Sequence, residues 1–189
     1  MSADERGAVE EIGPQDVLAF WRTAGPDKWF KKDPAFDSEI AVRFFAVWHA
    51  AAAGALAIWE ETPEGALALT IVLDQFPRNM FRGHARTYET DALARAVAGR
   101  ALARGFDAQV RRGLRQFFYL PLQHSEDLAD QERCVELARG HGDDEFLKYA
   151  ERHADIIRRF GRFPHRNAML GRITTPEEQA FLDGGGFAG

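Results

Sequence analysis

The sequence predicts an all-α protein built from antiparallel helical hairpins packed in an array or bundle. Apolar residues recur at spacings of three and four over several long stretches, which is the period of a helix buried on one face. Helix-start patterns, in which a capping side chain precedes proline or an acidic residue, recur along the chain. No segment shows a convincing strand pattern. About eight helices joined by short turns are expected, and short turns make neighbouring helices antiparallel.

The first two helices are expected at 15–23, opened by Pro14, and from Asp37 or Ser38 onward. Proline is tolerated at the first position of a helix because its missing N–H has no partner there. Gly25 and Pro26 are expected to end the first helix. The buried face of the second helix is expected to comprise Phe36, Ile40, Val42, Phe44, Phe45, Val47, Trp48 and Ala51.

A third helix is predicted to start at Thr62 and Pro63 and to be buried on all sides. Its segment 66–73 is apolar throughout and ends at Asp74. A carboxylate at the end of a buried run needs a partner or has a functional role, because an unpaired buried charge is costly. The following Phe76–Pro77 pair is predicted to end the helix.

The second half of the chain shows the same helical patterning. Further helices are expected at 91–104, 107–113, 128–139, 144–160 and about 176–182. Thr90, Ser125 or Asp127, and Thr175 are the expected N-terminal caps. The inward-facing residues are expected to include Leu93, Val97, Ala101, Leu128, Val135, Phe146, Ala150, His153, Ile157 and Phe160.

Composition narrows the class of protein. A chain of 189 residues predicts one domain, 13–183, between an acidic lead-in, 1–12, and a glycine-rich tail, 184–189. The net charge of −5 argues against a nucleic-acid partner. No apolar run reaches the ~20 residues that cross a bilayer, and the N-terminus does not resemble a signal peptide. With Cys134 as the single cysteine, these features predict a cytoplasmic protein without disulfides, and Cys134 is expected to be buried and inert.

Two segments, 73–83 (LDQFPRNMFRG) and 160–172 (FGRFPHRNAMLGR), share one pattern. Each follows an apolar run, contains Phe-Pro, and continues with arginine and asparagine. Both are predicted to be sharp exits from buried helices. The two phenylalanines are 163 − 76 = 87 positions apart, and no regular repeat of about 34 residues is found.

These motifs, together with 118–127 (FYLPLQHSED), resemble a family of uncharacterised, mostly bacterial proteins catalogued as a domain of unknown function. The resemblance extends from about Pro14 to Leu182. It implies a tetratricopeptide-repeat-like, right-handed array or bundle of stacked helical hairpins, and it implies no activity.

Polar residues in these motifs form the candidate ligand site. Arginine suits bidentate recognition of carboxylate or phosphate, asparagine adds donors, and histidine can shuttle a proton near neutral pH. The leading hypothesis is therefore a binding module whose arginine-lined pocket takes a small anionic ligand or an acidic peptide, without cofactor or metal. The candidate residues are Asp74, Arg78, Asn79, His124, Glu126, Arg162, His165, Arg166 and Asn167.

Two other interpretations remain open at this point. One is a small hydrolase or transferase that uses His124 or His165 with Asp74 or Glu126 as acid and base. The other is a structural or protein–protein interaction protein. In that case Asp74–Arg78 and Glu126–Arg166 are buried ion pairs that orient the hairpins, and the Phe-Pro-Arg-Asn segments are helix ends.

Overall fold

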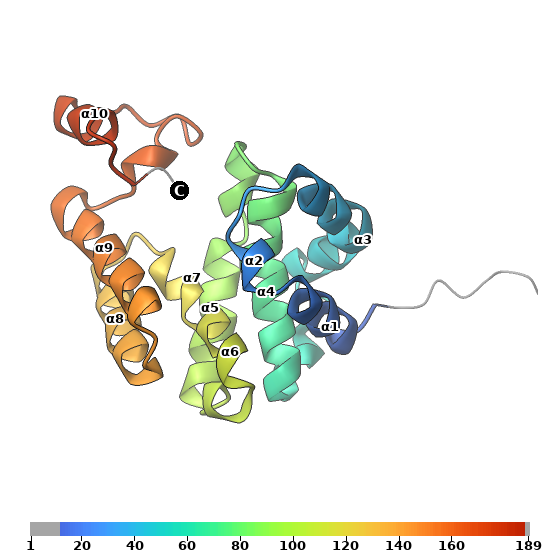
Figure 1. Ribbon diagram of the computed structural model, residues 1–189. Coiled ribbons are helices and arrows are strands. Elements are labelled where there is room, and N and C mark those ends of the chain that lie inside the picture. The colour runs from blue at the N-terminus through green and yellow to red at the C-terminus, as the bar shows by residue number, and fades with distance from the viewer. Residues whose placement is uncertain (1–11, 188–189) are drawn as a thin grey trace, which may run out of the picture.

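A computed structural model describes residues 12–187, and every regular element in that range is helical (Figure 1). The predicted all-α fold is confirmed. Of the predicted lead-in, 1–12, residues 1–11 lie outside the described residues, as do the last two residues of the predicted tail. The tetratricopeptide-like character of the packing stays a prediction.

The α-helices are α1 (Pro14–Ala24), α2 (Pro26–Trp29), α3 (Pro34–Ala52), α4 (Pro63–Met80), α5 (Asp91–Ala103), α6 (Arg112–Arg115), α7 (Leu120–Gln123), α8 (Leu128–His141), α9 (Asp144–Phe160) and α10 (Pro176–Asp183).

In the part of the chain that the structure describes, five short 3-10 helices connect these elements. They are η1 (Ala57–Glu61), η2 (Ala85–Tyr88), η3 (Asp107–Gln109), η4 (Gln116–Phe118) and η5 (Pro164–Arg166). The basic helix expected at 107–113 is therefore wrong: the chain forms η3, a break at Val110, and then α6. Within the described residues, no helix is both long and apolar enough to cross a membrane.

Helix α4 is the centre of the fold, with α3, α5, α1 and η1 packed around it (Figure 1). The run from Gly65 to Pro77 is buried, which confirms that the helix is enclosed on all sides. Thr62 caps it by accepting the N–H of Gly65 at 3.1 Å. On the far side of α5, α8 and α9 form a hairpin, and α10 lies with η5 beyond the end of α9.

The prediction that Phe76–Pro77 ends the third helix is wrong, because α4 continues through Pro77 to Met80. Proline has no N–H to donate to the carbonyl of Leu73, four residues earlier. The hydroxyl of Thr90 donates to that carbonyl instead, at 2.6 Å. Thr90 does not cap α5 with its side chain, which corrects the prediction; its hydroxyl oxygen accepts instead from Trp48 Nε1 at 3.3 Å.

Some buried faces and helix starts also differ from the sequence predictions. Helix α3 begins at Pro34, capped by the carboxylate of Asp33, so Asp37 is free for another role. Its buried residues are Phe36, Ile40, Phe44, Trp48 and Ala51, which confirms the central part of the expected face. The prediction was wrong for four residues that were expected to face inward and are exposed. They are Val42 and Phe45 on α3, Leu93 on α5 and Leu128 on α8.

A substitution at Gly65 tests how tightly α4 is enclosed. A Cβ added there would overlap the carbonyl oxygen of Trp59 and lie 2.8 Å from Thr62 Oγ1. Because the first obstacle is backbone, we expect Gly65→Ala to lower the free energy of unfolding by about 1–3 kcal/mol. Gly99→Ala on α5 is the matched control: its Cβ meets open space, so stability should stay equal or rise by up to ~1 kcal/mol. Urea denaturation measures both, and equal stability of the two variants would contradict the packing.

Candidate functional site

Five charged or titratable side chains form a continuous chain of contacts between α4, α5, the end of α7 and η5. His124 Nδ1 lies 2.8 Å from Asp74 Oδ1, and Arg78 Nη1 lies 3.4 Å from the same oxygen. Arg78 also donates to both oxygens of Asp91, at 2.9 and 3.1 Å. Arg166 Nη1 completes the series, 3.8 Å from Asp91 Oδ2. We call these five residues the charge chain.

The fully buried carboxylate of Asp74 organises one end of the charge chain. It lies on the face of α4 that meets α7, and Gln75 Nε2 donates to its second oxygen at 2.6 Å. Burial by itself would raise the pKa of Asp74, but Arg78 and His124 outweigh it and lower the pKa to about 2. The predicted Asp74–Arg78 pair is confirmed, and Asp74 is a carboxylate at neutral pH.

Arg166 lies at the other end of the charge chain and has unused hydrogen-bonding capacity. The residue is 7% exposed, and its guanidinium is placed between the rings of Tyr88 and Phe163, 4.6 and 4.4 Å from their centroids. Its Nε is enclosed and has no hydrogen-bond partner among the described residues. Burial, and then the neighbouring Arg78, lower the pKa of Arg166. A buried cation with an unsatisfied N–H is costly unless another group completes it.

Two further histidines lie close to Arg166. His165 Nδ1 is also enclosed without a partner in the described chain, and burial and Arg166 lower the pKa of His165 to about 4. His153 is 5% exposed, as expected for a core position, and its Nδ1 lies 2.8 Å from the carbonyl of Tyr149. Burial lowers the pKa of His153 to about 3. Both rings are therefore neutral at pH 7. The ring of Phe187 packs against both, with centroids 4.5 and 5.3 Å away.

The other candidate residues lie in separate polar contacts with clear structural partners. Asn79 donates to Asp37 at 2.8 Å, where Arg82 also binds. Arg162 and Asn167 both donate to Glu178 on α10, at 2.6 and 3.2 Å. The contacts of Arg162 and Asn167 attach the segment around η5 to α10, and that of Asn79 joins α4 to α3. Asn167 Oδ1 is enclosed without a hydrogen-bond partner among the described residues.

The predicted Glu126–Arg166 ion pair is wrong. Glu126 forms a bidentate pair with Arg172, two bonds of 2.8 Å, and accepts the N–H of Phe163 at 2.8 Å. Arg166 pairs instead with Asp91, which sequence reasoning missed. Asp91 follows the expected cap Thr90, so its sequence position is that of an ordinary first-turn acidic residue. Nothing local distinguishes it from such a residue.

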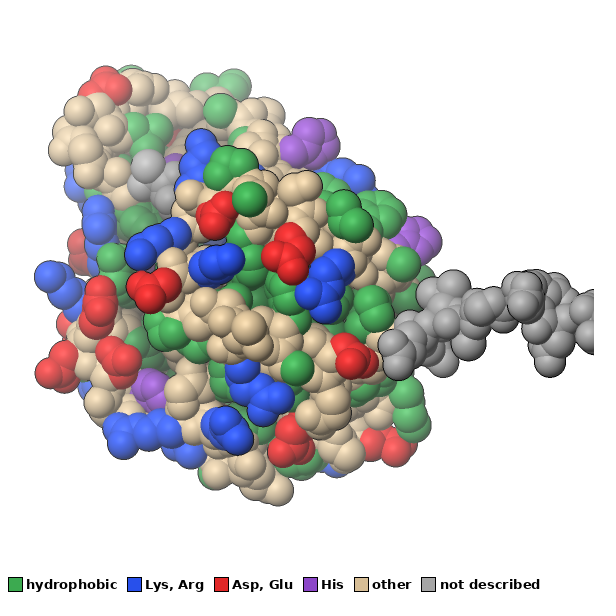
Figure 2. Space-filling model, turned by 45° about the vertical axis from the view of Figure 1, so that its right-hand side comes forward, with side chains coloured by type: hydrophobic (Ala, Val, Ile, Leu, Met, Phe, Trp, Pro, Cys, Tyr) green, Lys and Arg blue, Asp and Glu red, His purple; other side chains and the backbone are tan. Residues whose placement is uncertain are grey.

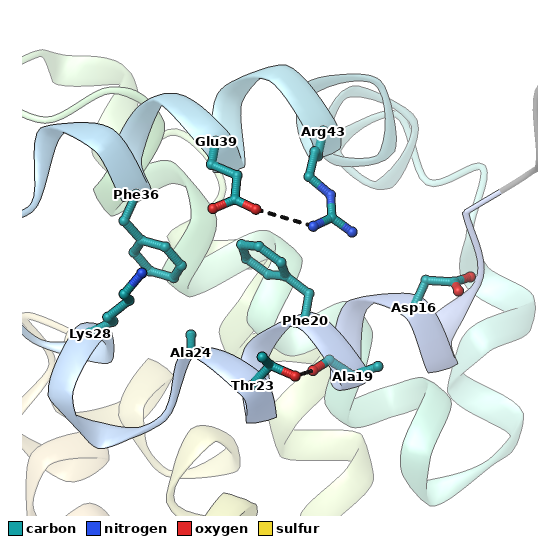
Figure 3. Close-up of a pocket in the computed structure, with 9 residues that line it drawn as sticks. All are labelled: Asp16, Ala19, Phe20, Thr23, Ala24, Lys28, Phe36, Glu39 and Arg43. Atoms are coloured by element: carbon teal, nitrogen blue, oxygen red, sulfur yellow. Dashed lines mark hydrogen bonds and ion pairs between the residues drawn. The ribbon is translucent and has the colours of Figure 1, made fainter.

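The charge chain is distinct from a cavity of about 370 Å³ elsewhere in the structure (Figure 3). That cavity lies between α1, α2 and α3, and none of the predicted site residues line it. Arg43 lies 4.7 Å above the ring of Phe20 there and pairs with Glu39 at 3.2 Å. The arginine-lined site is therefore a nearly closed polar cluster and not this open groove. On the face drawn in Figure 2, acidic and basic side chains are interspersed.

The described residues also bear on metal and thiol chemistry. In residues 12–187 no three His, Cys, Asp or Glu side chains are grouped as a metal site requires. Cys134 is buried, as expected, and burial raises the pKa of its thiol to about 12. Such a thiol is protonated at neutral pH and is a poor nucleophile.

Fold and site together define an all-helical protein whose ionisable residues are collected in a nearly enclosed cluster around a central buried helix. The chain belongs to the family described as "Bacterial protein of unknown function (DUF924)", which matches residues 17–186. It is similar to a solved structure from Agrobacterium tumefaciens, described as a protein of unknown function, ATU0120. The two are 51% identical, with a TM-score of 0.88 over 90% of this chain and 97% of that one. Among curated proteins there is no match.

Proposed function

We propose that the Arg166 end of the charge chain binds a small anionic molecule, which makes the protein an α-helical anion-binding module. The observation that supports this most directly is the enclosed Nε–H of Arg166. No described residue accepts a hydrogen bond from it. The only ion-pair partner of Arg166 in the described chain is 3.8 Å away and is already shared with Arg78. A carboxylate or phosphate oxygen would complete the guanidinium with charge-assisted hydrogen bonds.

Burial favours a small molecule over an acidic peptide as the ligand. Arg166 is 7% exposed, and Phe187 covers the neighbouring histidines. A peptide backbone needs an open groove along which its own polar groups are satisfied. A compact anion needs space only beside the guanidinium, so the acidic peptide becomes the less suitable partner.

The charge balance of the cluster predicts how binding depends on pH. Asp74 and Asp91 balance Arg78 and Arg166, so one bound monoanion adds a net negative charge. His165, whose free pKa is about 4, lies close to Arg166 and gains from protonation when an anion is present. Binding therefore takes up protons below the pKa that His165 has in the complex, and affinity should rise as pH falls toward 4, by at most tenfold per pH unit for each proton bound.

The expected result is measurable by isothermal titration calorimetry with benzoate and inorganic phosphate as probes. Wild type should bind at least one of them and should not bind benzamide, which has the shape of benzoate without its charge. Arg166→Gln should weaken binding by about 10- to 100-fold, the usual value of a hydrogen bond to a charged group. Arg139→Gln is the control, because Arg139 is exposed and pairs with Glu151, and neither residue belongs to the charge chain. Equal affinity in wild type and Arg166→Gln, or no binding of either anion, would reject the proposal.

A cytoplasmic location is part of the proposal. Its support is the single cysteine, buried and unpaired within the described chain, which suits a reducing compartment.

A further inference from the structure

His124 has the geometry of a side chain that removes protons. Its Nδ1 donates to Asp74 Oδ1 at 2.8 Å, and Asp74 is ionised, so the proton is held on Nδ1. The lone pair is consequently on Nε2. That atom makes no hydrogen bond to the described chain and is not among its enclosed unpartnered atoms, so its lone pair is free of the described residues. The side chain is 15% exposed, which leaves access for a water or a small molecule.

The carboxylate that orients His124 is itself rigidly held. Gln75 Nε2 occupies its second oxygen at 2.6 Å, and Arg78 contacts the first at 3.4 Å. A buried carboxylate that fixes the tautomer of a histidine, with the opposite nitrogen free, is the arrangement that recurs in general-base catalysis on unrelated folds. Arg78 then connects this pair, through Asp91, to Arg166.

We propose that His124 is the general base of a hydrolase that cleaves small esters carrying a carboxylate. The inference rests on the proposed anion-binding function, because Arg166 holds the carboxylate of the substrate. Asp74 is a positioning residue, which acts through His124. Arg78 supplies positive charge beside the carbonyl oxygen of the ester.

The chemistry requires no co-reactant besides water. His124 Nε2 takes a proton from a water molecule as the water oxygen forms a bond to the ester carbonyl carbon. In the tetrahedral intermediate the carbonyl oxygen carries the negative charge. When the carbonyl re-forms, the bond from carbon to the leaving oxygen breaks, and the imidazolium returns its proton to that oxygen. The products are a carboxylic acid and an alcohol, and His124 is again neutral.

The electrostatics of the cluster suit this role. Burial and the nearby Arg78 lower the pKa of His124, and the Asp74 and Asp91 carboxylates only partly oppose them. The imidazole is therefore unprotonated at pH 7 and able to accept a proton. Its imidazolium, once formed, is stabilised by the Asp74 carboxylate at 2.8 Å.

The test uses 4-acetoxybenzoate, whose carboxylate is para to the ester and cannot attack it. Its neutral counterpart is 4-acetoxybenzamide. Wild type should hydrolyse the anionic ester faster than an equal concentration of free imidazole, and should prefer it over the neutral one. His124→Gln should lower kcat/KM by at least 100-fold. His49→Gln, which removes an exposed histidine on α3, should leave it unchanged.

Asp74→Asn provides a readout that a purely structural role would not change. Without the carboxylate the pKa of His124 falls further, so the acidic limb of the pH–rate profile should move to lower pH, together with at least a tenfold loss in kcat. Circular dichroism confirms that the variant is folded. If Asp74→Asn is not folded, the role of His124 is decided by His124→Gln. The benzoate affinity of that variant is measured together with its activity.

The two proposals fail in distinguishable ways. Wild type that binds benzoate through Arg166 but hydrolyses no faster than imidazole overturns the role of His124 and keeps the binding function. Full activity in His124→Gln overturns it as well. Absence of benzoate and phosphate binding overturns both. Loss of activity in His124→Gln with benzoate affinity retained supports both.

Discussion

Replacing Asp74 with alanine is expected to destabilise the protein by about 3–5 kcal/mol, the usual cost of removing one member of a buried ion pair. The carboxylate is 0% exposed and interacts with His124, Arg78 and Gln75. Its removal leaves Nδ1 of His124 and the side-chain amide of Gln75 without their acceptor. Arg78 keeps its bidentate pair with Asp91, so the loss should fall toward the lower end of the range.

Urea denaturation with a matched exposed variant measures this effect. Asp27 pairs with Lys31 at 3.5 Å, but both side chains are largely exposed, so Asp27→Ala should leave stability unchanged within error. Asp74→Asn retains the size of the side chain and should fall between alanine and wild type. A loss below about 1 kcal/mol in Asp74→Ala would show that the buried charges are not coupled as their geometry indicates.

The second large effect is loss of stability in mild acid, caused by the two buried neutral histidines. The folded-state pKa values are about 3 for His153 and about 4 for His165, below the ordinary value of 6.5. A group with a depressed folded pKa binds more protons when unfolded, so stability is fully present above pH 6.5 and is lost as pH falls toward 4. Each histidine contributes a slope of up to ~1.4 kcal/mol per pH unit in that window.

His153→Phe separates this contribution from other acid effects. The ring lies between Phe163 and Phe187, with centroids 5.5 and 4.5 Å away, so phenylalanine preserves the packing. Between pH 6.5 and 4 the free energy of unfolding of this variant should fall less steeply than that of wild type. The difference in slope should correspond to about one bound proton. Asp74, with a pKa of about 2, loses its contribution only below about pH 4 and does not enter this window. A slope identical to wild type would contradict the assignment to His153.

The fold class was predictable because local rules and the buried face agree along most of the chain. Thr62 with Pro63, and Thr175 with Glu178, mark helix starts that the structure confirms. His153 was predicted to be buried from its position in an apolar stripe, and it is. Leu93 was misplaced because helical spacing defines a face only to within one or two positions when alanines surround it. Leu128 is exposed as the first residue of α8.

The candidate site was predictable only in part. Asp74, Arg78, His124 and Arg166 were expected, and the structure connects them. Asn79, Arg162 and Asn167 share the same motifs but bind Asp37 and Glu178. Their residue types suit a ligand site and a helix attachment equally well, so sequence could not separate the two. Asp91, which connects the two arginines, had no distinguishing pattern at all.

The sequence by itself determined an all-helical chain with an enclosed central helix, a carboxylate at the end of its apolar run, and a small set of motif residues for inspection. Tertiary structure decided whether each motif ends a helix and which charges meet. The Phe76–Pro77 pair shows why. A proline removes one hydrogen bond, and the helix continues because Thr90, distant in sequence, donates to the carbonyl of Leu73. Partners of this kind, such as Thr90 for Leu73 and Asp91 for Arg166, are brought together only by packing, because no local pattern encodes contacts between separate helices.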